Sequence, residues 1–110
     1  MITIKSTDVQ DAKLLKLEGK LLGGPEAQQL LEVLQELIDQ KVGKVVLNLE
    51  DVERMNSSGL GILISAFTSF KKNGGDLRIS SPNPTVYKLL EITKLTSVFQ
   101  LYSSDEDALV

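Results

Sequence analysis

Residues 48–61 decide the fold, and they read Asn-Leu-Glu-Asp-Val-Glu-Arg-Met-Asn-Ser-Ser-Gly-Leu-Gly. The three residues before this stretch, Val-Val-Leu at 45–47, are apolar without alternation, which predicts a central parallel strand buried on both faces. From the end of this stretch onward, apolar residues recur at helical spacing, at Leu60, Leu63, Ile64, Phe67 and Phe70. The sequence therefore predicts a buried strand joined to a helix that begins near Ser58, through a turn that carries two serines and two glycines.

Ser57 is the residue in this turn on which we expect the function to depend. The first N–H groups of a helix have no intrahelical partner, and the peptide dipoles add partial positive charge there. A phosphate carried by a serine at this position is stabilised by that field. Ser57 is therefore a candidate phosphoacceptor. In the purely structural alternative, both Ser57 and Ser58 only cap the helix. We assign this capping role mainly to Ser58.

The remaining sequence predicts alternating strands and helices. Strands are expected near residues 2–5, 13–19, 76–80 and 99–101, from alternating or short apolar runs. Helices are expected from Pro25 to about Lys41, from Pro84 to Thr93, and from Ser104 onward, where proline or a capping residue marks each start. The order is strand, strand, helix, strand, helix, strand, helix, strand, helix. It predicts an α/β fold with a mixed, mostly parallel sheet of about five strands and helices packed against it.

Residues 48–61 resemble the signature of the STAS domain family (sulphate transporter and anti-sigma factor antagonist), in particular its free-standing bacterial anti-anti-sigma factors. That signature has a strand ending in Asn-Leu or Asp-Leu, a short acidic and hydrophobic link, and Met-Asp-Ser-Ser-Gly-Leu-Gly or a near variant. Here the link is residues 50–54, and residues 55–61 read Met-Asn-Ser-Ser-Gly-Leu-Gly. The resemblance extends to residues 15–19, similar to the family's second strand, and to the Asn-Gly-Gly turn at residues 73–75.

The resemblance implies a function and a set of site residues. It implies an anti-sigma factor antagonist that binds an anti-sigma factor, itself an ATP-binding serine kinase, and that is switched off by phosphorylation at Ser57. Residues expected to contact the partner are Gly23, Gly24, Asn56, Ser57, Ser58, Gly59, Leu60 and Gly61. We expect Gly59 and Gly61 to leave the helix start bare, so that the partner approaches closely.

Two departures from the family pattern concern acidic groups. Asn56 stands where most phosphorylated members have Asp, and it keeps the hydrogen-bonding capacity of the side chain without its charge. A second family aspartate, expected soon after residues 19–21, has no counterpart, because Leu22, Gly23 and Gly24 occupy that region. In the family both acidic groups serve kinase contact or phosphorylation, so these departures bear on the modification and not on the fold.

Composition sets the outer bounds. The 110 residues are 42% hydrophobic and 25% charged, which predicts one globular domain over residues 1–110. The absence of Cys and His excludes disulfides, thiolate or imidazole zinc sites and Ser-His-Asp triads. A formal charge of −3 opposes non-specific nucleic-acid binding, and no apolar run is long enough to span a membrane. We expect a cytoplasmic, non-enzymatic protein without a cofactor or metal, monomeric or weakly dimeric when alone.

Two alternatives of other kinds remain open. In the first, the chain is a constitutive scaffold that binds a partner ATPase or a stressosome-like assembly without being modified. The absence of the family aspartate at Asn56 is compatible with this alternative. In the other it is a small-ligand module that binds a nucleotide or a lipid in a groove beside Gly23, Gly24 and Ser57. The carboxylates at Glu50, Asp51 and Glu53 are interpreted as a solvated loop.

Overall fold

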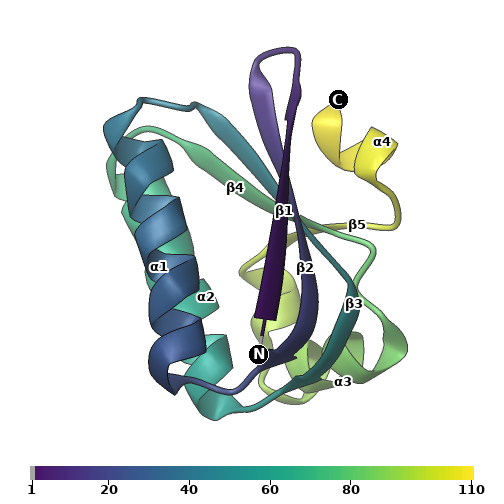
Figure 1. Ribbon diagram of the computed structural model, residues 1–110. Helices are drawn as coiled ribbons and strands as arrows, with labels where there is room; N and C mark the ends of the chain where they lie inside the picture. Colours follow the sequence, from purple (N-terminus) through teal and green to yellow (C-terminus); the bar gives the residue numbers. More distant parts are fainter. Residues whose placement is uncertain (1) are drawn as a thin grey trace.

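A computed structural model describes residues 2–110 as a five-stranded sheet with helices on both sides (Figure 1). The strands lie in chain order, with β1 antiparallel to β2 and the other neighbours parallel. The α/β fold predicted from the sequence is therefore confirmed. The elements are β1 (Ile2–Val9), β2 (Ala12–Leu21), α1 (Gly24–Asp39), β3 (Lys44–Met55), α2 (Ser57–Lys72), β4 (Asp76–Ser80), α3 (Pro84–Ile92), the short 3₁₀ helix η1 (Leu95–Ser97), β5 (Gln100–Tyr102) and α4 (Asp105–Leu109).

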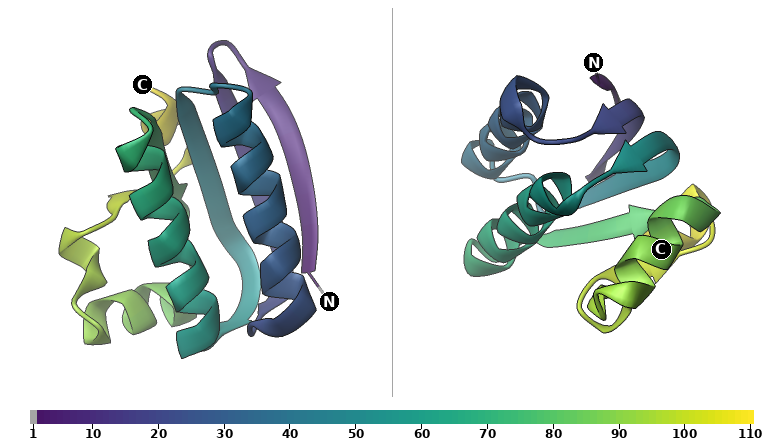
Figure 2. Two further views of the ribbon diagram at one scale, coloured as in Figure 1. Left: turned by 90° about the vertical axis from the view of Figure 1, so that its left-hand side faces the viewer. Right: turned by 90° about the horizontal axis from the view of Figure 1, so that it is seen from below.

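The main core lies between one face of the sheet and the helices α1 and α2, which run side by side along that face (Figure 2). The helices contribute the apolar stripes that their spacing predicted, and each fully buried Leu or Phe contributes about 1.5–3 kcal/mol relative to an exposed one. Buried members of this core from β2, β3 and the two helices include Leu15, Leu17, Leu47, Leu49, Leu30, Leu34, Leu63 and Phe70.

Strand β3 bends past its midpoint, because its pairing with β2 shifts register twice. Lys16 pairs with Asn48 but Glu18 pairs with Asp51, so β3 carries an extra residue there. The bend leaves strand carbonyls in need of donors. Asn83 supplies them, since its Nδ2 donates to the carbonyl oxygens of Leu49, Glu50 and Val52 at 3.2, 3.1 and 2.7 Å. Its Oδ1 accepts the Val86 N–H and so starts α3.

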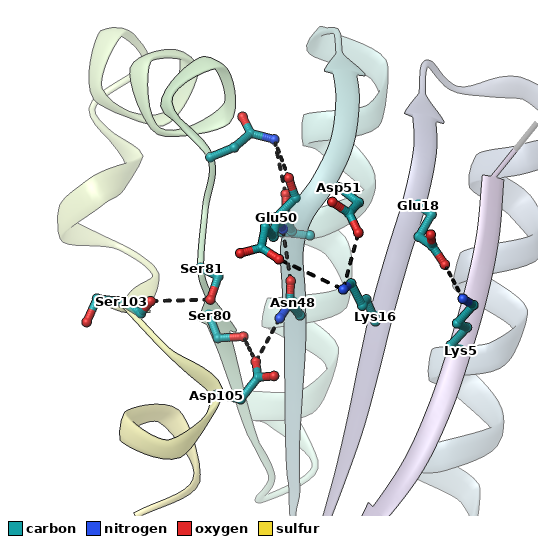
Figure 3. Close-up of polar contacts among 12 residues, drawn as sticks. Lys5, Lys16, Glu18, Asn48, Glu50, Asp51, Ser80, Ser81, Ser103 and Asp105 are labelled. Atoms are coloured by element: carbon teal, nitrogen blue, oxygen red, sulfur yellow. Dashed lines mark hydrogen bonds and ion pairs between the residues drawn. The ribbon is translucent and has the colours of Figure 1, made fainter.

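The opposite face of the sheet carries α4, which is held by polar contacts (Figure 3). The Asp105 carboxylate accepts from Asn48 Nδ2 at 2.9 Å and from the Ser80 hydroxyl at 2.5 Å, and both donors are buried. Arg78 donates from Nη1 to the carbonyl oxygens of Ala108 and Val110, at the end of the same helix. Cationic groups at a helix C-terminus are favourable, so α4 is fixed at both ends.

The exposed part of this face is charged. Lys16 lies 3.2 Å from the Asp51 carboxylate and 3.9 Å from Glu50, and its hydrogen bond with Asp51 raises the pKa of the lysine. Lys5 pairs with Glu18 on the neighbouring strands. Residues 50–54, expected to form a solvated loop, belong instead to the second half of β3. Glu50 and Asp51 form exposed ion pairs with Lys16, a kind of pair that contributes little to stability.

Several boundaries predicted from the sequence are shifted, most clearly in the first and last strands. The last strand begins at Gln100, so Phe99 precedes it, and its side chain is buried against Phe67 in an edge-to-face ring contact. The first strand continues beyond Lys5 to Val9, because it pairs with β2 along its whole length. The β1–β2 hairpin thus projects at the end of the molecule opposite to the starts of α1 and α2 (Figure 1).

We expect Asp105→Ala to lower the free energy of unfolding by about 1–3 kcal/mol, because the buried Asn48 and Ser80 donors lose their shared acceptor. Urea denaturation followed by circular dichroism measures the change. Glu106→Ala removes an exposed carboxylate from the next position and should stay within about 0.5 kcal/mol of the wild type. Equal effects of the two substitutions would contradict the role assigned to Asp105.

Candidate functional site

The site lies where two helices begin beside each other, at the carboxyl ends of β2 and β3, a common place for binding sites in α/β sheets. Gly23 and Gly24 precede and begin α1, and Ser57 and Ser58 begin α2. The two segments touch, since a Cβ placed on Gly23 would lie 2.8 Å from Ser58 Cβ. The structure therefore brings the Gly23-Gly24 turn and the two serines together. The starts of α1 and α2 lie side by side at the lower end of the left view in Figure 2.

Asn56 is the residue that caps α2. It has extended backbone angles, and its Oδ1 accepts the Gly59 N–H at 2.9 Å, while its main-chain oxygen accepts from Leu60. The helix begins at Ser57, one residue earlier than predicted, so the assignment of Ser58 as the cap was wrong. Asparagine and serine both cap helices well, and here the bend of β3 places Asn56 in the cap position.

Ser57 is exposed and occupies the first position of α2. Within residues 2–110 the N–H groups of Ser57 and Ser58 donate to no protein acceptor, because Asn56 satisfies those of Gly59 and Leu60 instead. The first turn of α2 carries no acidic residue. The Ser57 hydroxyl thus stands in the open at the positive end of a sixteen-residue helix, where added negative charge is favourable.

Gly59 and Leu60 belong to the interior of the protein. A Cβ on Gly59 would lie 2.0 Å from the carbonyl oxygen of Leu21, so only glycine allows the first turn of α2 to approach the end of β2 this closely. Leu60 is 5% exposed and packs in the core. Internal packing uses both residues, and the contact with a partner predicted for them remains untested. Gly61 differs, since a Cβ there would meet nothing within 4 Å.

An apolar groove of about 340 Å³ adjoins the site. Met55, which directly precedes Asn56, lines it together with residues of α3 that include Ile92, whose exposed fraction is 67%. Lys88 stands in the same lining. The sequence alone did not reveal this groove, which forms only when α3 packs beside the end of β3.

The side chains offer little for metal or membrane chemistry. Among residues 2–110 no three His, Cys, Asp or Glu side chains gather in a way that could hold a metal ion. In the same part of the chain, none of the helices combines the length and the apolar character needed to cross a lipid bilayer. Both serine side chains at the start of α2, Ser57 and Ser58, are exposed.

The structure is a small α/β domain with an exposed serine where its second helix begins, and comparison with known proteins assigns the family. Residues 3–108 match the STAS domain model. The protein belongs to the STAS domain family, as its residues 48–61 indicated.

Individual relatives agree with this assignment. An anti-sigma F factor antagonist from Paenibacillus polymyxa is 24% identical over 96 residues, which cover 87% of this chain and 82% of that protein. The structure of an anti-sigma factor antagonist from Mycobacterium paratuberculosis superposes with a TM-score of 0.87 at 24% identity, covering 99% and 92% of the two chains. The Bacillus cell fate determinant SpoIIAA in its phosphorylated form gives 0.76 at 19% identity, covering 97% and 96%.

We expect Gly59→Ala to abolish folding or to lower the free energy of unfolding by at least about 3 kcal/mol, because its methyl group would overlap the Leu21 carbonyl. Gly61→Ala is the matched control in the same helix. Its methyl group points into open space, so it should be neutral or raise stability by up to about 1 kcal/mol. Thermal denaturation of both variants measures the difference, and a well-folded Gly59→Ala protein would contradict the close approach.

Proposed function

We propose that the protein is an anti-sigma factor antagonist, a non-catalytic module that binds an anti-sigma factor and thereby releases a sigma factor. The observation that carries this proposal is the exposed Ser57 at the positive end of α2, contiguous with the Gly23-Gly24 turn. Membership of the STAS family and the names of the relatives support it. The docking surface comprises Gly23, Gly24, Asn56, Ser57, Ser58 and Gly61.

The groove beside Met55 extends this surface. Protein interfaces commonly combine an apolar centre with a polar rim. Here the exposed Ile92 supplies apolar area in a groove that Met55 also lines, with Lys88 in the same lining. We assign the groove to the same partner, because Met55 and Asn56 are consecutive residues.

Phosphorylation of Ser57 by the partner, acting as an ATP-dependent serine kinase, is the switch in this proposal. A phosphate adds about 1.5–2 negative charges at neutral pH, and the helix start stabilises them by only about 0.3–1 kcal/mol in each favourable contact. The folded state tolerates this charge because Ser57 is exposed. A partner contact must desolvate it, so the modified protein stays folded and releases its partner.

A constitutive scaffold is the second candidate, and Asn56 favours it. The residue before the phosphoacceptor carries an amide that is engaged in two hydrogen bonds, and no carboxylate stands in the first turn of α2. In this case the protein binds the same class of partner without modification. Co-purification from the native cell identifies the partner, and incubation of that partner with ATP, followed by mass mapping, separates the two candidates.

We expect Ser57→Glu to leave the thermal midpoint within a few degrees of the wild type and to abolish co-purification of the anti-sigma factor, because it places charge in the contact but not in the core. Ser65→Glu places the same charge on an exposed position two turns further along α2 and should retain the partner. The proposal fails if Ser57→Glu captures the anti-sigma factor as well as Ser65→Glu does, or if phosphate maps elsewhere while binding persists.

A further inference from the structure

The turn between β2 and α1 has few restraints of its own. Gly23 and Gly24 have φ angles of 92° and 70°, in the left-handed region, and neither has a side chain to pack. Gly23 is the N-cap of α1 and has no side chain with which to cap the helix. Two consecutive glycines lose much conformational entropy when they are ordered. Contacts from neighbouring segments therefore matter for the order of this turn.

Asn56 supplies such a group through the second end of its side chain. While Oδ1 accepts the Gly59 N–H, Nδ2 donates to the carbonyl oxygen of Leu22 at 3.0 Å. The main-chain N–H of Asn56 also points to the Leu21 carbonyl oxygen, at 3.4 Å. One residue thus binds the last two carbonyls before the Gly23-Gly24 turn and starts α2 at the same time.

The two partners fix the orientation of the amide. One is a donor and the other is an acceptor, so reversing the amide would oppose two N–H groups on one side and two oxygens on the other. A carboxylate keeps the bond to Gly59 but has no hydrogen for Leu22, and its second oxygen would face the Leu22 carbonyl oxygen. An aspartate at this position can cap the helix but cannot hold the turn.

We propose that Asn56 is a positioning residue, which holds the Gly23-Gly24 turn against the start of α2 so that both present one preorganised docking surface. We infer the ordering of the turn from the hydrogen bonds of Asn56 alone, whereas the effect of this ordering on partner affinity rests on the proposed function. The Asn56–Leu22 hydrogen bond is exposed, so it contributes little to global stability but decides how often the turn is in place.

The chain contains a matched control for this role. Asn83 also caps a helix with Oδ1 and donates from Nδ2 to strand carbonyls, but on α3 and β3. Asn56→Ser and Asn83→Ser each retain a capping hydroxyl and remove the amide donor. The two variants thus lose the same amide donor, one at the start of α2 and the other at the start of α3.

Backbone ¹⁵N relaxation of the isolated protein tests the ordering. We expect Asn56→Ser to lower the order parameters of Gly23 and Gly24 from about 0.85 to below about 0.6, with the thermal midpoint nearly unchanged. Asn56→Asp should loosen the turn at least as much, and Asn83→Ser should leave it rigid. An unchanged turn in Asn56→Ser overturns the proposal, as does equal loosening in Asn83→Ser.

The effect of the ordered turn on partner affinity is tested by binding to the anti-sigma factor that co-purifies with the wild-type protein. We expect Asn56→Ser to weaken this affinity about fivefold, because the turn must be ordered on binding. Weaker binding with a rigid turn would mean that Asn56 acts on the partner only as a member of the docking surface, and it would overturn the positioning role. If no anti-sigma factor co-purifies, the proposed function fails, while the relaxation data still decide whether Asn56 holds the turn.

Discussion

The close approach of α2 to the end of β2 is the constraint on which the rest of the site depends. Gly59 lets the first turn of the helix lie against the Leu21 carbonyl, at a distance that no other residue would allow. The same first turn follows the Asn56 cap and carries the exposed Ser57. The contact between Gly59 and Leu21 joins the end of β2 to the start of α2. Because α1 follows β2 directly, the Gly23-Gly24 turn then lies against Ser58.

Asparagine side chains make the polar connections that hold this fold together. Asn48, Asn56 and Asn83 each accept a main-chain N–H with Oδ1 and donate from Nδ2 to a group far away in the sequence. An amide suits these places because it offers both a donor and an acceptor without charge, so it needs no counterion. The hydrogen bonds of these asparagines reach α4, the start of α1 and the bent part of β3. They therefore help to hold the short helices α3 and α4 against the sheet.

Local signals predicted most of the fold. The apolar run at 45–47, the helical spacing after it, and the starts at Pro25, Asn83-Pro84 and Ser104 all correspond to observed elements. What the sequence did not reveal depends on contacts between distant segments. The role of Gly59 requires Leu21, and Asp105 meets Asn48 across 57 positions. Choosing Asn56 over Ser58 as the cap required the bend of β3, because both residue types favour that position.

The packing of Gly59 has a consequence for the kinetics of association. A helix wedged this tightly onto its strand has no low-energy way to shift or unwind its first turn, so an incoming macromolecule meets a surface already in its final shape. Encounters at such rigid surfaces are limited mainly by mutual orientation, with rate constants of about 10⁵–10⁷ M⁻¹s⁻¹. Differences in the lifetime of complexes, and not in the speed of their formation, would then distinguish one partner from another.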